Sequence, residues 1–164
     1  MRNSSIRKMD ISNGPDIRAS IFVQGCTFNC KGCFNPDTHD FNGGKEYTEE
    51  TKEAVLQLCE NKMVKGLSVL GGEPLHPNNI EEVTKLAKAF KERFPDKNLW
   101  VWSGFLYETY VHDKEIAQYI DVLVDGQFVL ELKDLRLPYC GSSNQRVIDV
   151  KKTRETGSIV LYKK

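Results

Sequence analysis

Short apolar runs alternate along the chain with longer segments in which apolar residues recur every three or four positions. The short runs are typical of buried β-strands, and the periodic segments indicate amphipathic helices. We expect strands at residues 18–24, 66–70, 99–102, 121–124, 146–150 and 158–162. We expect helices from Thr48 onward, from about Asn79 to Arg93, and over part of 106–119.

The alternation of strand and helix favours a parallel sheet with right-handed crossover connections. A closed barrel of eight such units needs roughly 250 residues, whereas this chain has 164. We therefore predict an α/β fold, a partial and open β/α barrel with a mostly parallel sheet. No repeat, low-complexity tract or linker divides the sequence, so we expect one domain over residues 1–164.

The loops that follow the predicted strands contain the residues whose side chains could bind a ligand or take part in a reaction. In parallel α/β folds, ligands bind at the edge of the sheet where the carboxyl ends of the strands meet. We therefore expect a site built from the loops at 26–33, 71–73, 103–104 and 125–127.

Three cysteines are crowded into the first of these loops. Cys26, Cys30 and Cys33 are separated by three and two residues, close enough for their thiolates to converge on one centre. A [4Fe-4S] cluster held by four cysteines carries electrons. Three ligands leave one iron open, and an open coordination position distinguishes catalytic from structural metal sites. Of the two other cysteines, Cys59 is expected in the core and Cys140 in a loop without a role in metal binding.

Zinc is the main alternative to an iron–sulfur cluster. Cys26, Cys30, Cys33 and His39 would form a Cys3His set with plausible spacing. In that case the chain would be a zinc-binding interaction module without catalysis. The cysteine spacing alone leaves both interpretations open.

The charge balance narrows the range of partners. The chain has 23 Lys and Arg against 23 Asp and Glu, which argues against a nucleic-acid binder with a concentrated basic face. Residues 131–164 have eight basic and four acidic side chains, and this tail is either a solvated surface or a docking face for an acidic partner. No apolar run approaches the roughly 18 residues of a membrane-spanning helix. We see no secretory signal and expect a cytoplasmic protein.

The cysteine loop together with Gly71-Gly72-Glu73-Pro74 resembles the radical S-adenosylmethionine (SAM) enzymes. Further segments resemble one branch of that superfamily, the activating proteins of anaerobic ribonucleoside-triphosphate reductases. These segments are Asn13-Gly14-Pro15, Cys33-Phe34-Asn35 and residues 100–105, 121–126 and 141–146. The resemblance covers nearly the whole chain and implies a radical SAM type of partial barrel.

The resemblance also implies a mechanism. One [4Fe-4S] cluster per chain would be held by Cys26, Cys30 and Cys33, with SAM chelating the open iron. One electron would split SAM into methionine and a 5′-deoxyadenosyl radical, which would take hydrogen from a glycine of the large catalytic subunit of the reductase. The expected electron donor is a flavodoxin, and both a homodimer and a heterotetramer with the reductase are open. Pyruvate formate-lyase, another glycyl-radical enzyme, is the alternative target, although its activase is expected to be longer.

The resemblance and the strand-end positions together suggest residues that contact SAM. Gly71 and Gly72 would let the backbone approach the ligand, and Glu73 would accept a hydrogen bond from its ammonium group. The further candidates are Phe34, Ser103, Asp125, Asn144 and Arg146.

For several of these positions a structural role is equally open. Ser103 and Asp125 could be cap or turn residues, and residues 141–146 could form a turn or meet the partner. Trp102 is expected in the core.

The sequence departs from the family pattern at two positions. Many radical SAM enzymes have an aromatic residue before the third cysteine, where this chain has Gly32, and Phe34 is the candidate replacement. Asp16 follows Asn13-Gly14-Pro15, where the family often has glycine.

Overall fold

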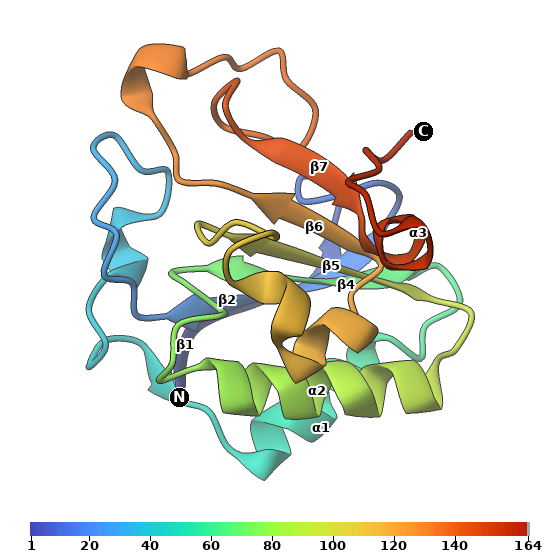
Figure 1. Ribbon diagram of the computed structural model, residues 1–164. Helices are drawn as coiled ribbons and strands as arrows, with labels where there is room; N and C mark the ends of the chain where they lie inside the picture. Colours follow the sequence, from blue (N-terminus) through green and yellow to red (C-terminus); the bar gives the residue numbers. More distant parts are fainter. Residues whose placement is uncertain (164) are drawn as a thin grey trace.

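The apolar runs form the centre of a seven-stranded sheet in the computed structural model, which describes residues 1–163 (Figure 1). The strands lie in the order β3-β1-β2-β4-β5-β6-β7. Their bounds are β1 Arg2–Asp10, β2 Arg18–Gln24, β3 Lys45–Glu46, β4 Gly66–Gly71, β5 Asn98–Ser103, β6 Val122–Asp125 and β7 Arg146–Asp149. The helices are α1 Glu49–Leu58, α2 Ile80–Arg93 and α3 Val150–Thr156, with short 3-10 helices at Pro36–Thr38, Val111–Asp113, Glu115–Gln118 and Leu130–Leu132.

The predicted parallel arrangement is confirmed for the middle of the sheet. Strands β2, β4, β5 and β6 pair in parallel, whereas β1 and β3 on one side and β7 on the other pair antiparallel. The sheet is therefore mixed and open. The connection from β6 to β7 contains no α-helix that could return the chain for another parallel strand.

Two expectations about individual elements are wrong. Residues 106–119 form two 3-10 helices in place of an α-helix, and 158–162 contributes one isolated bridge between Leu161 and Ile148. The strand expected at 146–150 is confirmed as β7 and ends one residue earlier, at Asp149, whose side chain accepts a hydrogen bond from Lys152 N and caps α3. The expected start of α1 is confirmed, because Thr48 and Thr51 form a capping box.

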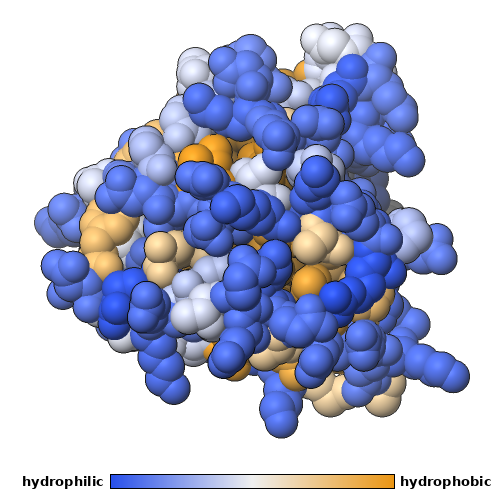
Figure 2. All heavy atoms as spheres, turned by 90° about the horizontal axis from the view of Figure 1, so that it is seen from below, coloured by the Kyte–Doolittle hydropathy of each residue, from blue (hydrophilic) through white to orange (hydrophobic). Residues whose placement is uncertain are grey.

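The two faces of the sheet are covered differently. Helices α1 and α2 pack on one face, where they form the main core with residues of β2, β4, β5 and β6 (Figure 1). On the other face Trp100, Val122 and Val124 form a smaller cluster beneath Tyr139 and Tyr162. The outer surface on the α1 and α2 side is mainly hydrophilic, with hydrophobic side chains in small separate groups (Figure 2). None of the helices in residues 1–163 is long and apolar enough to cross a membrane.

The loop between β1 and β2 folds back over the sheet. The carbonyl oxygen of Asn13 accepts a hydrogen bond from Ser68 Oγ at 2.6 Å. Asp16 has a φ of +63°, in the left-handed region that favours glycine and that Asp tolerates better than most residues. The family's preference for glycine at this position is therefore consistent with the backbone that Asp16 adopts.

Arg18 is the largest charged side chain in the interior. It is fully buried, and its guanidinium donates hydrogen bonds to Ser68 Oγ at 2.7 Å and to three carbonyl oxygens. These carbonyls belong to Pro15, Leu67 and Asn98. Burial lowers the pKa of Arg18 to about 10. One side chain thus links β2 to β4, β5 and the loop before β2.

We expect Arg18→Ala to lower the free energy of unfolding by about 3 kcal/mol, because it leaves a cavity and several buried acceptors without donors. Urea denaturation followed by circular dichroism measures the effect. Arg136→Ala is the matched control, since the Arg136 side chain is 90% exposed and pairs only with Asp134. The control should change the free energy by less than about 0.5 kcal/mol. Equal effects of the two substitutions would contradict the structural role of Arg18.

Candidate metal centre

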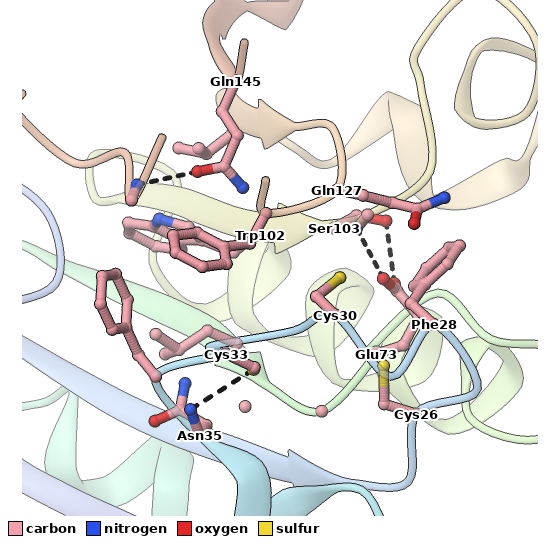
Figure 3. Close-up of a pocket in the computed structure, with 18 of the residues that line it drawn as sticks. Cys26, Phe28, Cys30, Cys33, Asn35, Glu73, Trp102, Ser103, Gln127 and Gln145 are labelled. Carbon is pink, nitrogen blue, oxygen red and sulfur yellow. Dashed lines mark hydrogen bonds between the residues drawn. The ribbon is translucent and has the colours of Figure 1, made fainter. Parts of the chain in front are cut away.

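The cysteine loop leaves the end of β2 and is closed at its base by backbone hydrogen bonds. Gly25 N donates to Thr38 O at 2.7 Å, and Cys26 N donates to His39 O at 3.1 Å. Within the loop, Cys33 N donates to Cys30 O at 3.1 Å. All three cysteines are partly buried and line one cavity of about 420 Å³ (Figure 3). The structure thus brings the three predicted ligands to the same space.

The turn after β4 packs directly against the base of this loop. Gly72 N donates to Val23 O and Glu73 N to Gly25 O, each at 2.7 Å. A Cβ atom on Gly72 would lie 2.6 Å from Gly25 O and 2.7 Å from Thr38 O. Gly71 has a φ of +114° and is also in close contact with the backbone of β2. Gly71 and Gly72 both line the cavity, where they were expected to let the backbone approach a ligand. Their lack of a side chain first of all lets the turn after β4 lie against the end of β2 and the base of the cysteine loop.

Glu73 is a buried carboxyl group at the wall of the cavity. It accepts hydrogen bonds from Gly104 N at 2.6 Å, Ser103 Oγ at 2.8 Å and Leu75 N at 2.9 Å. Burial raises the pKa of Glu73 to about 7, against the opposing effect of these three donors. A carboxylate offers about four lone-pair positions, so one stays available for a ligand. Ser103, another predicted site residue, lines the cavity and holds this carboxylate.

Three of the predicted SAM-binding residues do not line the cavity. Asp125 is fully buried and accepts hydrogen bonds from Tyr107 N at 2.9 Å and Arg146 Nε at 3.0 Å. In strand β6 successive side chains alternate between the two faces, and it is Val124 that lines the cavity. Arg146 also pairs with Glu108.

The third of these residues, Asn144, donates to Gln127 O at 2.8 Å. The contacts of Asp125, Arg146 and Asn144 are therefore with protein groups at the edge of the sheet.

Phe34 lines the cavity as expected, with its ring 5.0 Å from the ring of Phe128. At Gly32, the position before the third cysteine, φ is +76° and a Cβ atom would lie 2.7 Å from Leu130 Cδ1. In this chain Leu130 therefore occupies the space next to position 32, and an aromatic side chain would be strained there.

Several residues of the opposite wall were not predicted from the sequence. Trp102, expected in the core, is half-buried and lines the cavity, and its Nε1 donates to Tyr139 O at 2.9 Å (Figure 3). Trp102 lies on the same face of β5 as the buried Trp100, two residues closer to the carboxyl end of the strand. This position near the ligand-binding edge of the sheet was the one sign in the sequence that Trp102 could line the cavity. Other lining residues that the sequence did not single out include Phe128, Tyr139 and Gln145, while Phe28 and Gln127 lie in loops that were expected to contribute.

The chemistry of the donor set fits an iron–sulfur cluster, because three cysteine thiols from one loop line one cavity. His39, the fourth residue of the alternative zinc set, also lines it. Among residues 1–163, no three Cys, His, Asp or Glu side chains lie close enough together to hold one metal ion. Burial raises the pKa of Cys26 and of Cys30, so binding of a metal would displace their protons.

Three thiols at the carboxyl ends of parallel strands define a candidate iron–sulfur protein, and comparison with known proteins agrees. Residues 12–148 match the family model described as a 4Fe-4S single cluster domain.

Several curated relatives share one name, anaerobic ribonucleoside-triphosphate reductase-activating protein. That of Vibrio cholerae serotype O1 is 40% identical over 140 residues, which is 84% of this chain and 90% of the relative. That of Escherichia coli K12 is 39% identical, covering 85% and 92%. The protein of Enterobacteria phage T4 is 35% identical, covering 90% and 93%. The chain belongs to the family of anaerobic ribonucleoside-triphosphate reductase-activating proteins.

Gly72→Ala is expected to displace the cysteine loop, because the new methyl group would collide with two carbonyl oxygens. We expect at least a roughly twofold loss of iron bound after anaerobic reconstitution, together with a lower melting temperature. Gly157→Ala serves as the control. Unlike Gly72 it has a positive φ, of +76°, but no atom lies within 4 Å of the position that its methyl group would take, so it should cost about 1 kcal/mol and leave iron binding unchanged. Full iron binding by Gly72→Ala would disprove the packing role of this glycine.

Proposed function

We propose that this chain activates an anaerobic ribonucleoside-triphosphate reductase by cleaving SAM at a [4Fe-4S] cluster held by Cys26, Cys30 and Cys33. The observation that carries the proposal is that three thiols from one loop open onto a cavity that also contains a buried carboxylate. The names of the relatives and the match to a 4Fe-4S domain support it. The chain would then be an oxidoreductase that acts in the cytoplasm.

Each group at the cavity has a role in this proposal. In this proposal Cys26, Cys30 and Cys33 would hold the cluster through their thiolates and would leave one iron without a protein ligand, open to SAM. Glu73 accepts a hydrogen bond from the ammonium of SAM through its free lone pair. The apolar wall, including Phe28 and Trp102, excludes water from the nucleoside. When bound, the reduced cluster supplies one electron to the sulfonium, which yields methionine and a 5′-deoxyadenosyl radical that takes a hydrogen atom from a glycine.

The partner in this proposal is the large subunit of the reductase, which contains that glycine. A one-electron donor such as a flavodoxin reduces the cluster, and the assembly is a homodimer or a heterotetramer with the reductase. The proposed target is the reductase and not pyruvate formate-lyase because the relatives are named for the reductase. The direct test incubates the iron-loaded chain with SAM, a reductant and the reductase, and records a glycine-centred signal by electron paramagnetic resonance. A colourless protein with one zinc per chain would support the zinc module instead.

Cys30→Ala should lower SAM cleavage at least about a thousandfold, because the cluster then loses one of its three ligands. The assay measures 5′-deoxyadenosine under anaerobic conditions. Cys140→Ala is the matched control, since Cys140 also lines the cavity but lies outside the loop. It should retain both the cluster and the cleavage. Loss of the cluster in Cys140→Ala would mean that a fourth thiol fills the position assigned to SAM, and the proposal would be wrong.

Glu73→Gln is expected to weaken SAM binding by about tenfold, because a neutral amide replaces the carboxylate that faces the ligand's ammonium. SAM binding to the iron-loaded protein is measured by equilibrium dialysis, with iron content as the check that the site is intact. Glu81→Gln, on the exposed face of α2, should have no effect. An unchanged dissociation constant with full iron content would exclude Glu73 as a SAM contact.

A further inference from the structure

The loop between β6 and β7 lies over the cysteine loop. We call residues 126–141 the cover loop. Leu130 Cδ1 fills the space beside Gly32, and the ring of Phe128 packs 5.0 Å from the ring of Phe34. Lys133 Nζ lies 5.4 Å from the centre of the Phe34 ring. Gly32 and Phe34 are the two neighbours of Cys33 in the chain. The cover loop therefore packs against the residues on both sides of one predicted ligand.

The residues that follow the cover loop bind its beginning through their side chains. We call Ser142, Asn144, Gln145 and Arg146 the anchoring residues. Each one makes a hydrogen bond to a different residue at the start of the loop. The four bonds are Arg146 Nε to Asp125 Oδ1 at 3.0 Å, Gln145 Nε2 to Gly126 O at 2.9 Å, Asn144 Nδ2 to Gln127 O at 2.8 Å and Val129 N to Ser142 Oγ at 3.2 Å.

These contacts continue the antiparallel pairing of β6 with β7. Asp125 and Arg146 are the last paired residues of the two strands. Beyond this pair, residues 126, 127 and 129 are joined to residues 145, 144 and 142, respectively. The residue numbers thus increase along one segment as they decrease along the other, as in an antiparallel ladder. Side chains replace the backbone groups as hydrogen-bonding partners, so the chain can separate into a wide loop that is still fixed at its base.

Gln145 holds both ends of the cover loop. Its Oε1 accepts hydrogen bonds from Gly141 N at 2.8 Å and Ser142 N at 3.2 Å, while its Nε2 donates to Gly126 O (Figure 3). Asn144 adds a second brace, because its Oδ1 accepts a bond from Ser142 Oγ at 2.6 Å. One amide group therefore ties the first residue of the loop to the last.

We propose that Asn144 and Gln145 are positioning residues that hold the cover loop against the cysteine loop, so that Phe128 and Leu130 shield Cys33 and the cluster bound there from water. The effect on the cluster rests on the function proposed above, whereas the anchoring of the loop does not. Hydrogen bonds to the ligating sulfur and exposure to solvent both set the reduction potential of an iron–sulfur cluster. A loosened cover loop should therefore change that potential and admit oxygen and chelators.

The test uses the double variant Asn144→Ala/Gln145→Ala, which removes the side-chain bonds of both residues. Hydrogen–deuterium exchange by mass spectrometry, on protein without metal, should show at least about tenfold faster exchange in residues 126–141, because those bonds are lost. On the iron-loaded protein, the cluster should be lost at least about threefold faster in the presence of a ferrous chelator. Its midpoint potential should also shift, because the cluster becomes more exposed to solvent.

Controls separate these effects from general unfolding. Asn78→Ala changes an exposed asparagine before α2 and should alter neither measurement. Gln145→Glu keeps the acceptor for Gly141 N and loses the donor to Gly126 O, so its exchange rate should lie between those of the wild type and the double variant. Exchange in β4 and β5 should stay unchanged in all variants, which shows that the sheet is intact.

Two results would overturn the inference. Unchanged exchange in residues 126–141 would show that the side chains do not hold the loop. Faster exchange with an unchanged chelation rate and potential would show that the loop does not shield the cluster. If the wild type binds no iron at all, the proposed function fails, while the exchange measurement still decides whether the loop is anchored.

Discussion

The candidate site depends on one backbone contact, between the turn after β4 and the first residue of the cysteine loop. Glu73 N donates to Gly25 O, and Gly72 N donates to Val23 O. These bonds extend the parallel pairing of β2 and β4 beyond the ends of the two strands. The loop with the thiols and the turn with the carboxylate are therefore fixed relative to each other by main-chain geometry. A side chain at position 72 has no room there, which ties the Gly-Gly sequence to the placement of the thiols.

The central strands could be predicted from sequence because both faces of the sheet are buried around them. β2 is buried at all seven positions and β6 at all four, and each contains a short apolar run, Ile21–Val23 in β2 and Val122–Val124 in β6. Strand β1, which lies next to the short edge strand β3, has no such run. Its buried residues are Asn3 and Asp10, and it is stabilised by pairing with β2, which the sequence of β1 does not reveal. Helix α3 is seven residues long and largely polar, so its caps at Asp149 and Gly157 were the only local signals.

The candidate site was predictable where it depends on neighbours in the sequence. Cys26, Cys30 and Cys33 lie on one loop, and Glu73 follows a strand directly, so spacing alone placed them at one edge of the sheet. Asp125 and Arg146 also lie at that edge, yet their side chains pair with each other and not with the cavity. This outcome depends on which face of the sheet each residue occupies and on the pairing of β6 with β7 across the long loop between them, neither of which the sequence specifies. The sequence analysis placed Trp102 in the core together with Trp100. Tertiary packing decides where along β5 the core ends and the cavity begins, and the sequence alone does not show this point.

The two walls of the cavity are held in different ways. The cysteine loop and the turn at Glu73 are joined by main-chain bonds at positions that admit no side chain, so this wall has little freedom to move. The cover loop is joined at its base by side-chain bonds, each of which contributes about 1 kcal/mol, and by two main-chain bonds, from Ser143 N to Leu132 O and from Asp134 N to Gly141 O. Several of its leucines are exposed. The wall with the thiols and Glu73 is therefore fixed more tightly than the wall that the cover loop forms.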